Sequence, residues 1–199
     1  MPEKLLRGGG FVPSRTQIVC LHEGKKGRSI DPVFIGSLLK ALAPVWVRRT
    51  GNNFIRTVDG GGRKELIAKM PAELRSCADQ GGKTTLMVWA DLDDNMVSGD
   101  QLREEFWKVA KEQQITREEF DTVVFVFAKD RLENWIQFLN TGNTDESLEG
   151  PRIKHDAQVA AAARTLASRC KSGAGGSQFP PSLTWSCANW RRLVERMKD

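Results

Sequence analysis

Short apolar runs that alternate with segments of helical spacing restrict the fold of this chain more than any other feature. Apolar residues dominate the runs at 18–21, 45–47, 84–90 and 122–127. Runs of this length, bounded by turn-forming residues, are typical of strands that are buried on both faces. Such strands belong to parallel sheets, because the crossover helices of a parallel sheet cover both of its faces.

Helical spacing fills the intervals between these runs. Asp31-Pro32 predicts a helix start with proline in the first turn, and Pro44 predicts the end of that helix. The Gly- and Asn-rich segment 50–62 is expected to be a loop or hairpin. Further helices are expected over 63–79, from Gly99 or Asp100 to Gln114, after the run at 122–127, within 152–170 and at the C-terminus.

This order of elements predicts an α/β fold, with a mostly parallel four-stranded sheet flanked by helices. We divide the chain into a flexible N-terminal segment at 1–14, a main α/β domain at 15–155 and a small C-terminal helical extension at 156–199. A linker rich in Gly, Ser and Pro is expected at 171–182 within the extension.

The six tryptophans divide into two groups. Trp89 and Trp135 lie in apolar patterns and are expected in the core, whereas Trp185 and Trp190 lie near arginines and are expected to be more open. Open tryptophans can stack on nucleic-acid bases. A core or partner-docking role is the alternative for them.

The sequence favours a cytoplasmic protein without a membrane partner. No apolar run approaches the ~18 residues needed to span a bilayer. The first residues lack the apolar core of a signal peptide. The four cysteines are scattered, without a C-x-x-C pair, as is typical of reduced thiols.

The charge distribution is compatible with a polyanionic partner. The net charge is +5. Basic residues concentrate at 25–28, 48–56 and 191–198, whereas acids gather around 91–105 and 118–121. An enzyme that uses cations to act on a polyanion needs such an acidic pocket with basic flanks. Each cluster alone is also compatible with an ordinary solvated surface.

Acidic side chains follow three of the predicted strands. They are Glu23 after the run at 18–21, Asp91, Asp93 and Asp94 after the run at 84–90, and Asp130 and Glu133 after the run at 122–127. Because the carboxyl ends of parallel strands share one edge of a sheet, these carboxylates are expected to converge. Clustered carboxylates need a cation to offset their charge, and their oxygens favour Mg²⁺ or Mn²⁺ over zinc. Such an ion can promote phosphodiester cleavage.

The order of these acids resembles the Toprim family of nucleic-acid enzymes. That family has one Glu after its first strand and an Asp-x-Asp after a later strand. Here HEG at 22–24 follows a strand, and VWADLDD at 88–94 contains a later strand and the acids after it. Glu23 matches the family glutamate, and Asp91 and Asp93 match the Asp-x-Asp pair. The resemblance implies a Rossmann-like catalytic domain over residues 15–155 with a Mg²⁺ site.

Within the family, the chain is similar to the small OLD-like (overcoming lysogenisation defect) nucleases of bacterial defence systems. AKDRLENWI at 128–136 resembles their strand-to-helix acidic motif, in which Glu133 is the matching metal ligand and catalytic residue. Lys154 matches, by order along the chain, a lysine that offsets phosphate charge. Topoisomerases of the family often carry a third acid where this chain has Asn95, so the adjacent Asp94 is a further expected ligand.

The resemblance implies a metal-dependent nuclease that acts on DNA or RNA. The chain has no ATPase motif, so the ATPase that often accompanies such nucleases would be a separate partner protein. The absence of tyrosine excludes topoisomerase strand passage by this chain alone.

Other functions remain open at this point. One alternative is a non-catalytic Toprim-fold subunit that binds nucleic acid or regulates a partner. Another is an α/β phosphotransfer enzyme that uses Asp91 as its nucleophile. Taken singly, Glu23 is compatible with a turn acid beside Lys25 and Lys26, and the acids at 91–94 with an Asx turn or a helix cap.

Overall fold

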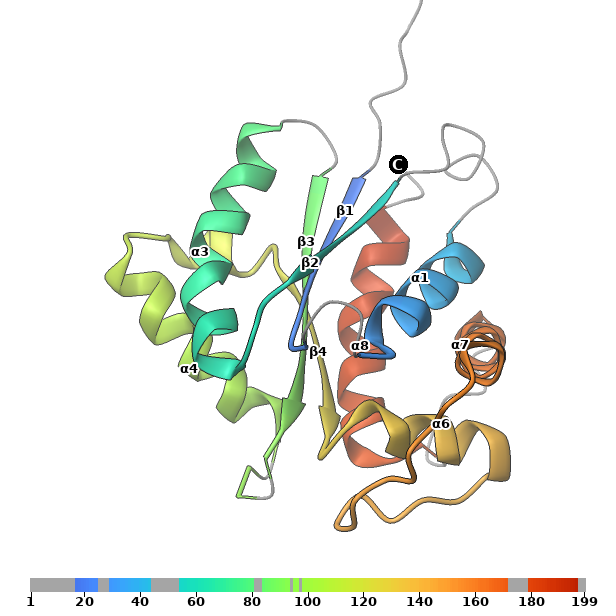
Figure 1. Cartoon of the computed structure of the whole chain (residues 1–199). Helices are drawn as coiled ribbons and strands as arrows, with labels where there is room; N and C mark the ends of the chain where they lie inside the picture. The colour runs from blue at the N-terminus through green and yellow to red at the C-terminus, as the bar shows by residue number, and fades with distance from the viewer. Residues whose placement is uncertain are drawn as a thin grey trace, which may run out of the picture.

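A four-stranded parallel sheet organises the protein. The computed structural model describes residues 17–24, 29–43, 54–80, 84–93, 95–96, 98–171 and 179–196. The strands are β1 (Gln17–His22), β2 (Ile55–Asp59), β3 (Thr84–Leu92) and β4 (Val124–Lys129), in the order β2-β1-β3-β4. Every pairing between them is parallel, so their carboxyl ends lie at one edge of the sheet, at the bottom of Figure 1. The predicted α/β class is confirmed.

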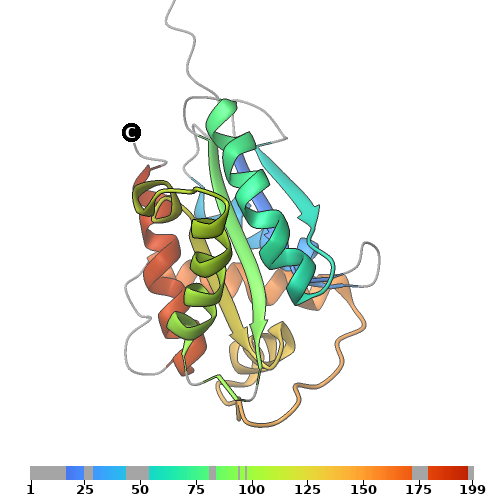
Figure 2. The ribbon, with the colours of Figure 1, turned by 90° about the vertical axis from the view of Figure 1, so that its left-hand side faces the viewer.

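Helices cover both faces of the sheet (Figures 1 and 2). On one side lie α3 (Arg63–Asp79) and α4 (Gly99–Glu112), which is followed by the short α5 (Arg117–Phe120). On the other side lie α1 (Asp31–Leu42), α6 (Leu132–Thr141), α7 (Asp156–Lys171) and α8 (Pro181–Arg196). α7 packs along α1, and α8 packs along β4. Within the described part of the chain, no helix has the length and apolar character that a membrane span requires.

Alternate side chains along the strands pack into two core layers, one on each face of the sheet. In β3, Met87 and Trp89 belong to the core that includes α1 and α8, whereas Leu86 and Val88 belong to the core that includes α3 and α4. Successive side chains of a strand point to opposite faces. Asp91 therefore lies on the same side as Met87 and Trp89. The register of β3 decides which helices surround this acid.

The edge strand β4 is covered by α8. The Oγ of Ser186 accepts a hydrogen bond from the Phe127 N–H at 2.9 Å and donates one to the Phe127 carbonyl at 3.0 Å. A helix side chain thus satisfies backbone groups that would otherwise need a neighbouring strand. Trp190 on α8 is 1% exposed and stacks on Trp89 at a centroid distance of 6.4 Å. The expectation that Trp190 is open is wrong, because this face of α8 is turned to the sheet; the buried position of Trp89 is confirmed.

The segment 50–62, expected to be a loop or hairpin, contains the strand β2. It pairs with β1 from Ile18 opposite Ile55 to His22 opposite Asp59. Two of its side chains, at 56 and 57, are exposed because the strand lies at the sheet edge. These two exposed side chains point to opposite faces of the sheet and interrupt the apolar pattern of the strand in the sequence. The strand expected at 45–47 lies outside the described residues.

β3 continues past Ala90, where the apolar run ends. Asp91 is opposite Ala128 and Leu92 is opposite Lys129 in the pairing with β4. Backbone pairing does not require an apolar side chain, so the strand extends over the first acid of the motif. Asp91 therefore lies within the strand and has a fixed direction.

Candidate active site

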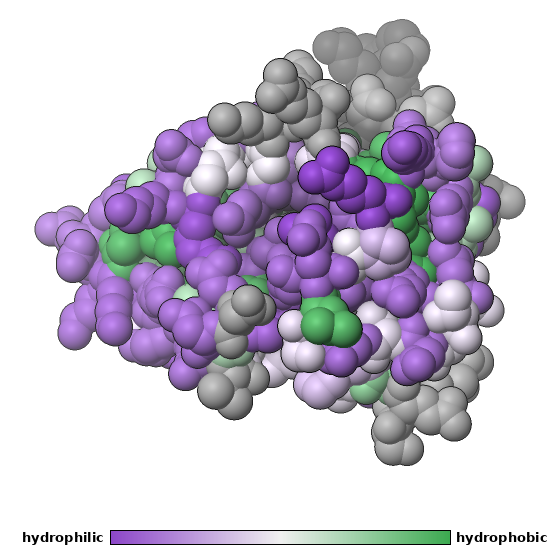
Figure 3. Space-filling view, turned by 60° about the horizontal axis from the view of Figure 1, so that its bottom comes forward, coloured by the Kyte–Doolittle hydropathy of each residue, from purple (hydrophilic) through white to green (hydrophobic). Residues whose placement is uncertain are grey.

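A pocket of about 590 Å³ opens at the carboxyl edge of the sheet. Figure 3 shows this end of the molecule, where hydrophilic residues predominate. The lining comes from the turn after β1, the start of α1, the end of β3, the junction of β4 with α6 and the segment before α7. Its charged residues are Glu23, Asp31, Asp91, Asp130, Arg131, Glu133, Arg152 and Lys154. The pocket thus combines carboxylates and cations.

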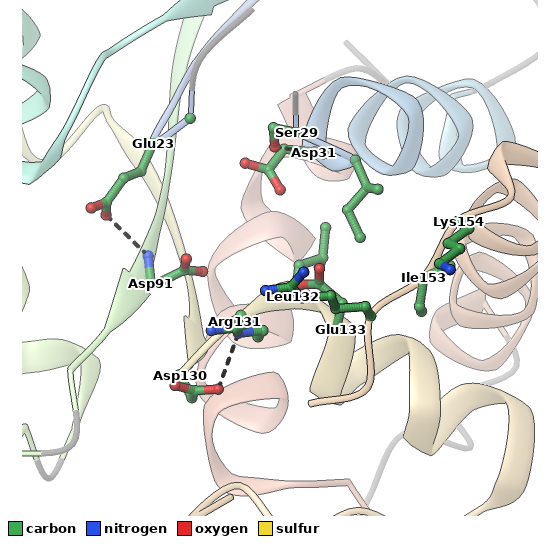
Figure 4. Close-up of a pocket in the computed structure, with 13 residues that line it drawn as sticks. Glu23, Ser29, Asp31, Asp91, Asp130, Arg131, Leu132, Glu133, Ile153 and Lys154 are labelled. Carbon is green, nitrogen blue, oxygen red and sulfur yellow. Dashed lines mark hydrogen bonds and ion pairs between the residues drawn. The ribbon is translucent and has the colours of Figure 1, made fainter. Parts of the chain in front are cut away.

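Glu23 and Asp91 are adjacent but point in different directions. Asp91 points from β3 towards the side of the sheet where Asp31 lies (Figure 4). Glu23 points away from Asp31, and its Oε2 accepts a hydrogen bond from the Asp91 N–H at 3.3 Å. The Glu23 N–H donates to the Trp89 carbonyl at 2.9 Å. The turn after β1 is therefore fixed against β3.

Asp91 lies among other carboxylates. Burial raises the pKa of Asp91 well above its ordinary 3.8. The charges of Asp31, Glu23 and Glu133 raise it further. Burial, together with the charges of Glu133 and Glu23, also raises the pKa of Asp31 from 3.8 to about 6. A bound cation would offset the repulsion between these carboxylates and favour their ionised forms.

Two of these acids stand in the first turns of helices. Asp31 begins α1, and Glu133 is the second residue of α6. The positive end of a helix dipole favours negative charge there and offsets part of the repulsion. His22 lies near Asp31, with 3.8 Å between its Nδ1 and the Asp31 Oδ2. Burial lowers the pKa of His22, so its imidazole is neutral at neutral pH and does not balance the charge of Asp31.

Arg63, the first residue of α3, lies against the acids on the other side of the strand ends. Its Nε is 3.8 Å from Glu23 Oε2. Its Nη1 donates to the carboxylate of Asp93, and its Nη2 donates to the Asp91 carbonyl oxygen. Burial raises the pKa of Glu23, and the charge of Arg63 opposes that rise. Asp93 is 64% exposed and is held by Arg63.

The other part of the pocket is basic. Arg131 is partly neutralised, because its Nε lies 3.3 Å from Asp130 Oδ2 and its Nη1 lies 2.6 Å from Glu149 Oε1. Arg152 and Lys154 are exposed and lie on the segment that leads into α7. An anionic ligand in the pocket can therefore reach cationic side chains as well as the acidic cluster.

The acidic part of the pocket has the donor chemistry of a hard-cation site. Its donors are carboxylate oxygens, which Mg²⁺ and Mn²⁺ prefer. Among the described residues, no three His, Cys, Asp or Glu side chains are placed to hold one metal ion together. Mg²⁺ commonly uses only one or two protein carboxylates and completes its shell with water and phosphate oxygens. Asp91 and Asp31, which both line the pocket, offer two carboxylates of this kind.

The structure brings together most of the residues that the sequence nominates. Glu23, Asp91, Glu133 and Lys154 all line the pocket. Asp93 does not line it, and instead borders a separate hollow with Leu92, Asn95 and Asp130. Asp94 lies outside the described residues.

Sequence patterns do not single out Asp31 or Arg63. Asp31 resembles an ordinary helix-start residue, and Arg63 is one of many basic residues. Both, however, begin a helix that follows a parallel strand, and this places both at the carboxyl edge of the sheet. That position is the signal that would have identified them.

Comparisons of the chain with protein-family models, with curated proteins and with solved structures found no match. The pocket itself is therefore the basis for a functional assignment. Fold alone does not specify function, because one α/β fold can carry many kinds of site.

Proposed function

We propose that the protein is a metal-dependent, Toprim-type nuclease that cleaves nucleic-acid phosphodiesters with Mg²⁺ or Mn²⁺. The observation that carries the proposal is the surroundings of Asp91. Its carboxylate shares a pocket with Asp31 and Glu133, and burial and their charges raise its pKa. Folding brings these acids together from three separate elements despite their repulsion. Such an arrangement is most common where the acids have a function.

Each group in the pocket has a role that its chemistry allows. Glu23 and Asp91 would hold the cation, in keeping with their places in the Toprim pattern. A cation bound there would offset the charge of the carboxylates and would supply a Lewis acid for a phosphodiester. Glu133 stands in the same pocket and orients a water molecule by accepting its hydrogen bond. Arg152 and Lys154 contact phosphate oxygens and stabilise the negative charge that develops on them.

Cleavage assays test this proposal. Purified protein is incubated with plasmid, single-stranded DNA or tRNA in the presence of Mg²⁺, Mn²⁺ or EDTA. We expect at least one substrate to be cut only with a divalent cation, and the activity to be lost in Glu23→Gln and Asp91→Asn. Asp121→Asn removes the same charge at an exposed site outside the pocket and should retain activity. Cleavage that survives EDTA, or that is unchanged in Asp91→Asn, contradicts the proposal.

The Toprim resemblance extends the proposal to a cellular setting. We place the protein in the cytoplasm as the effector of a bacterial anti-phage system, working with a separate ATPase. Phage plaque counts on cells that express the chain together with an ATPase from the same gene cluster test this part. Protection should require both proteins, and Glu23→Gln should abolish it. Protection that Glu23→Gln leaves intact would argue against a nuclease effector.

Arg63 favours a second candidate, a non-catalytic Toprim-fold subunit that binds nucleic acid or regulates a partner. Its guanidinium contacts the carboxylates of Glu23 and Asp93. If that guanidinium permanently takes the place of a metal ion, divalent cations do not bind. Thermal denaturation with and without millimolar Mg²⁺ separates the two candidates. A rise in Tm that Asp91→Asn removes supports the nuclease, and an unchanged Tm supports the subunit.

A further inference from the structure

We infer that Arg63 competes with the divalent cation for Glu23 and so sets the cation affinity of the pocket. This inference rests on the function proposed above and concerns the control of that same site. In the cation-free protein Glu23 is attracted to Arg63, and in the loaded protein it turns to the cation. Removal of Arg63 should therefore tighten cation binding.

The contacts of Arg63 place it where it can compete with a cation for Glu23. Its side chain is 16% exposed, so water screens its charge only partly. One guanidinium reaches the carboxylates of Glu23 and Asp93 and the backbone carbonyl of Asp91. Arg63 therefore touches all three acidic positions of the motif. Its single positive charge is shared between the side chains of Glu23 and Asp93, and the Asp91 carboxylate is left to the pocket.

The contact between Arg63 and Glu23 is the loosest of these. The distance from Nε to Oε2 is 3.8 Å, which is longer than a hydrogen bond. The Nε of Arg63 is buried and has no hydrogen-bond partner. Glu23 is thus attracted to Arg63 without being locked to it. When Glu23 turns away, Asp93 and the Asp91 carbonyl still anchor the guanidinium.

Glu23 already borders the pocket. Its Oε2 already accepts a hydrogen bond from the Asp91 N–H at 3.3 Å. Asp91 and Asp31 repel one another on the pocket side, so a cation that enters there gains both of them as attractive neighbours. It then attracts Glu23 as well. A carboxylate shared by a guanidinium and a divalent ion brings two positive charges together, so each weakens the binding of the other.

Calorimetric titration of Mn²⁺ into the cation-free protein tests the inference. We expect Arg63→Gln to bind Mn²⁺ about tenfold more tightly than the wild type, equivalent to about 1.4 kcal/mol. The matched control is Arg103→Gln, which removes the same charge from a pair with Asp121 outside the pocket. Its affinity should equal that of the wild type. Arg63→Lys keeps a charge but not the planar guanidinium, and its affinity should lie between those of the wild type and Arg63→Gln.

The possible outcomes separate this inference from the proposed function. If both Arg63 variants bind Mn²⁺ no more tightly than the wild type does, the inferred competition is overturned, whereas the proposed metal site is not. Absence of binding by every protein overturns both. Arg63→Lys decides the case if Arg63→Gln does not fold, as judged by circular dichroism. Loss of the heat signal in Asp91→Asn shows that the titrated site is this pocket.

Discussion

Replacement of Asp31 by Asn is expected to stabilise the cation-free protein at neutral pH. The pKa of Asp31 is raised from 3.8 to about 6, and its side chain is 20% exposed. One pKa unit corresponds to about 1.4 kcal/mol, so ionised Asp31 destabilises the folded state by about 3 kcal/mol. Its place in the first turn of α1 is worth up to about 1 kcal/mol to a carboxylate, which Asn forgoes. The expected net gain is about 2 kcal/mol.

The coupling between protonation of Asp31 and folding determines how the stability gained by Asp31→Asn depends on pH. The folded protein holds a proton on Asp31 up to a higher pH than the unfolded chain does. Between about pH 4 and pH 6 the folded state therefore binds more protons, and wild-type stability falls as the pH rises. The penalty is fully present above about pH 6 and nearly absent below about pH 4. Asn does not ionise, so the advantage of Asp31→Asn should shrink at acid pH.

Urea denaturation in EDTA, at about pH 7.5 and about pH 4, measures this difference. Asp121→Asn is the matched control, because Asp121 is 46% exposed and pairs with Arg103 and Arg117. Its loss should cost no more than about 1 kcal/mol. If Asp31→Asn is no more stable than the wild type near pH 7.5, the destabilisation of ionised Asp31 by burial and by the charges of Glu133 and Glu23 is refuted.

Three further substitutions test the fold that positions the pocket. Ser186→Ala leaves the Phe127 N–H and carbonyl without this partner and should cost about 1–3 kcal/mol in urea denaturation; an unchanged midpoint contradicts the edge-covering role of α8. Gly60→Ala places a Cβ 2.7 Å from the His22 carbonyl oxygen, so the Tm should fall, and a wild-type Tm would show that the turn after β2 is not tightly packed. Trp190→Ala should cost about 3–5 kcal/mol, whereas a surface tryptophan would cost little.

Much of the fold follows from the sequence because each buried strand is an apolar run with a helix after it. The exceptions have a common physical cause. β2 lies at the sheet edge, so the exposed side chains at 56 and 57 interrupt its pattern. β3 extends to Leu92 because pairing with β4 continues under the charged Asp91. Side-chain chemistry reports burial, whereas strand length also depends on the neighbouring backbone.

The candidate site was predictable only in part, for a similar reason. Glu23 and Asp91 could be predicted because acids after apolar strands must meet at one edge. Which acids line the pocket and which contact Arg63 could not be predicted, because this depends on the side of the sheet that each acid faces. Arg63 lies 40 residues from Glu23 and 30 from Asp93 in the sequence, and only the three-dimensional arrangement pairs them. No local pattern contains that information.

A crystal structure of the protein with Mn²⁺ tests the central claim most directly, because an anomalous difference map locates the manganese. We predict a manganese peak in the pocket, about 2 Å from a carboxylate oxygen of Asp91, with Glu23 turned from Arg63 towards the ion. A peak only in the hollow beside Asp93 and Asn95, or no peak at saturating Mn²⁺, would contradict a cation site at Asp91.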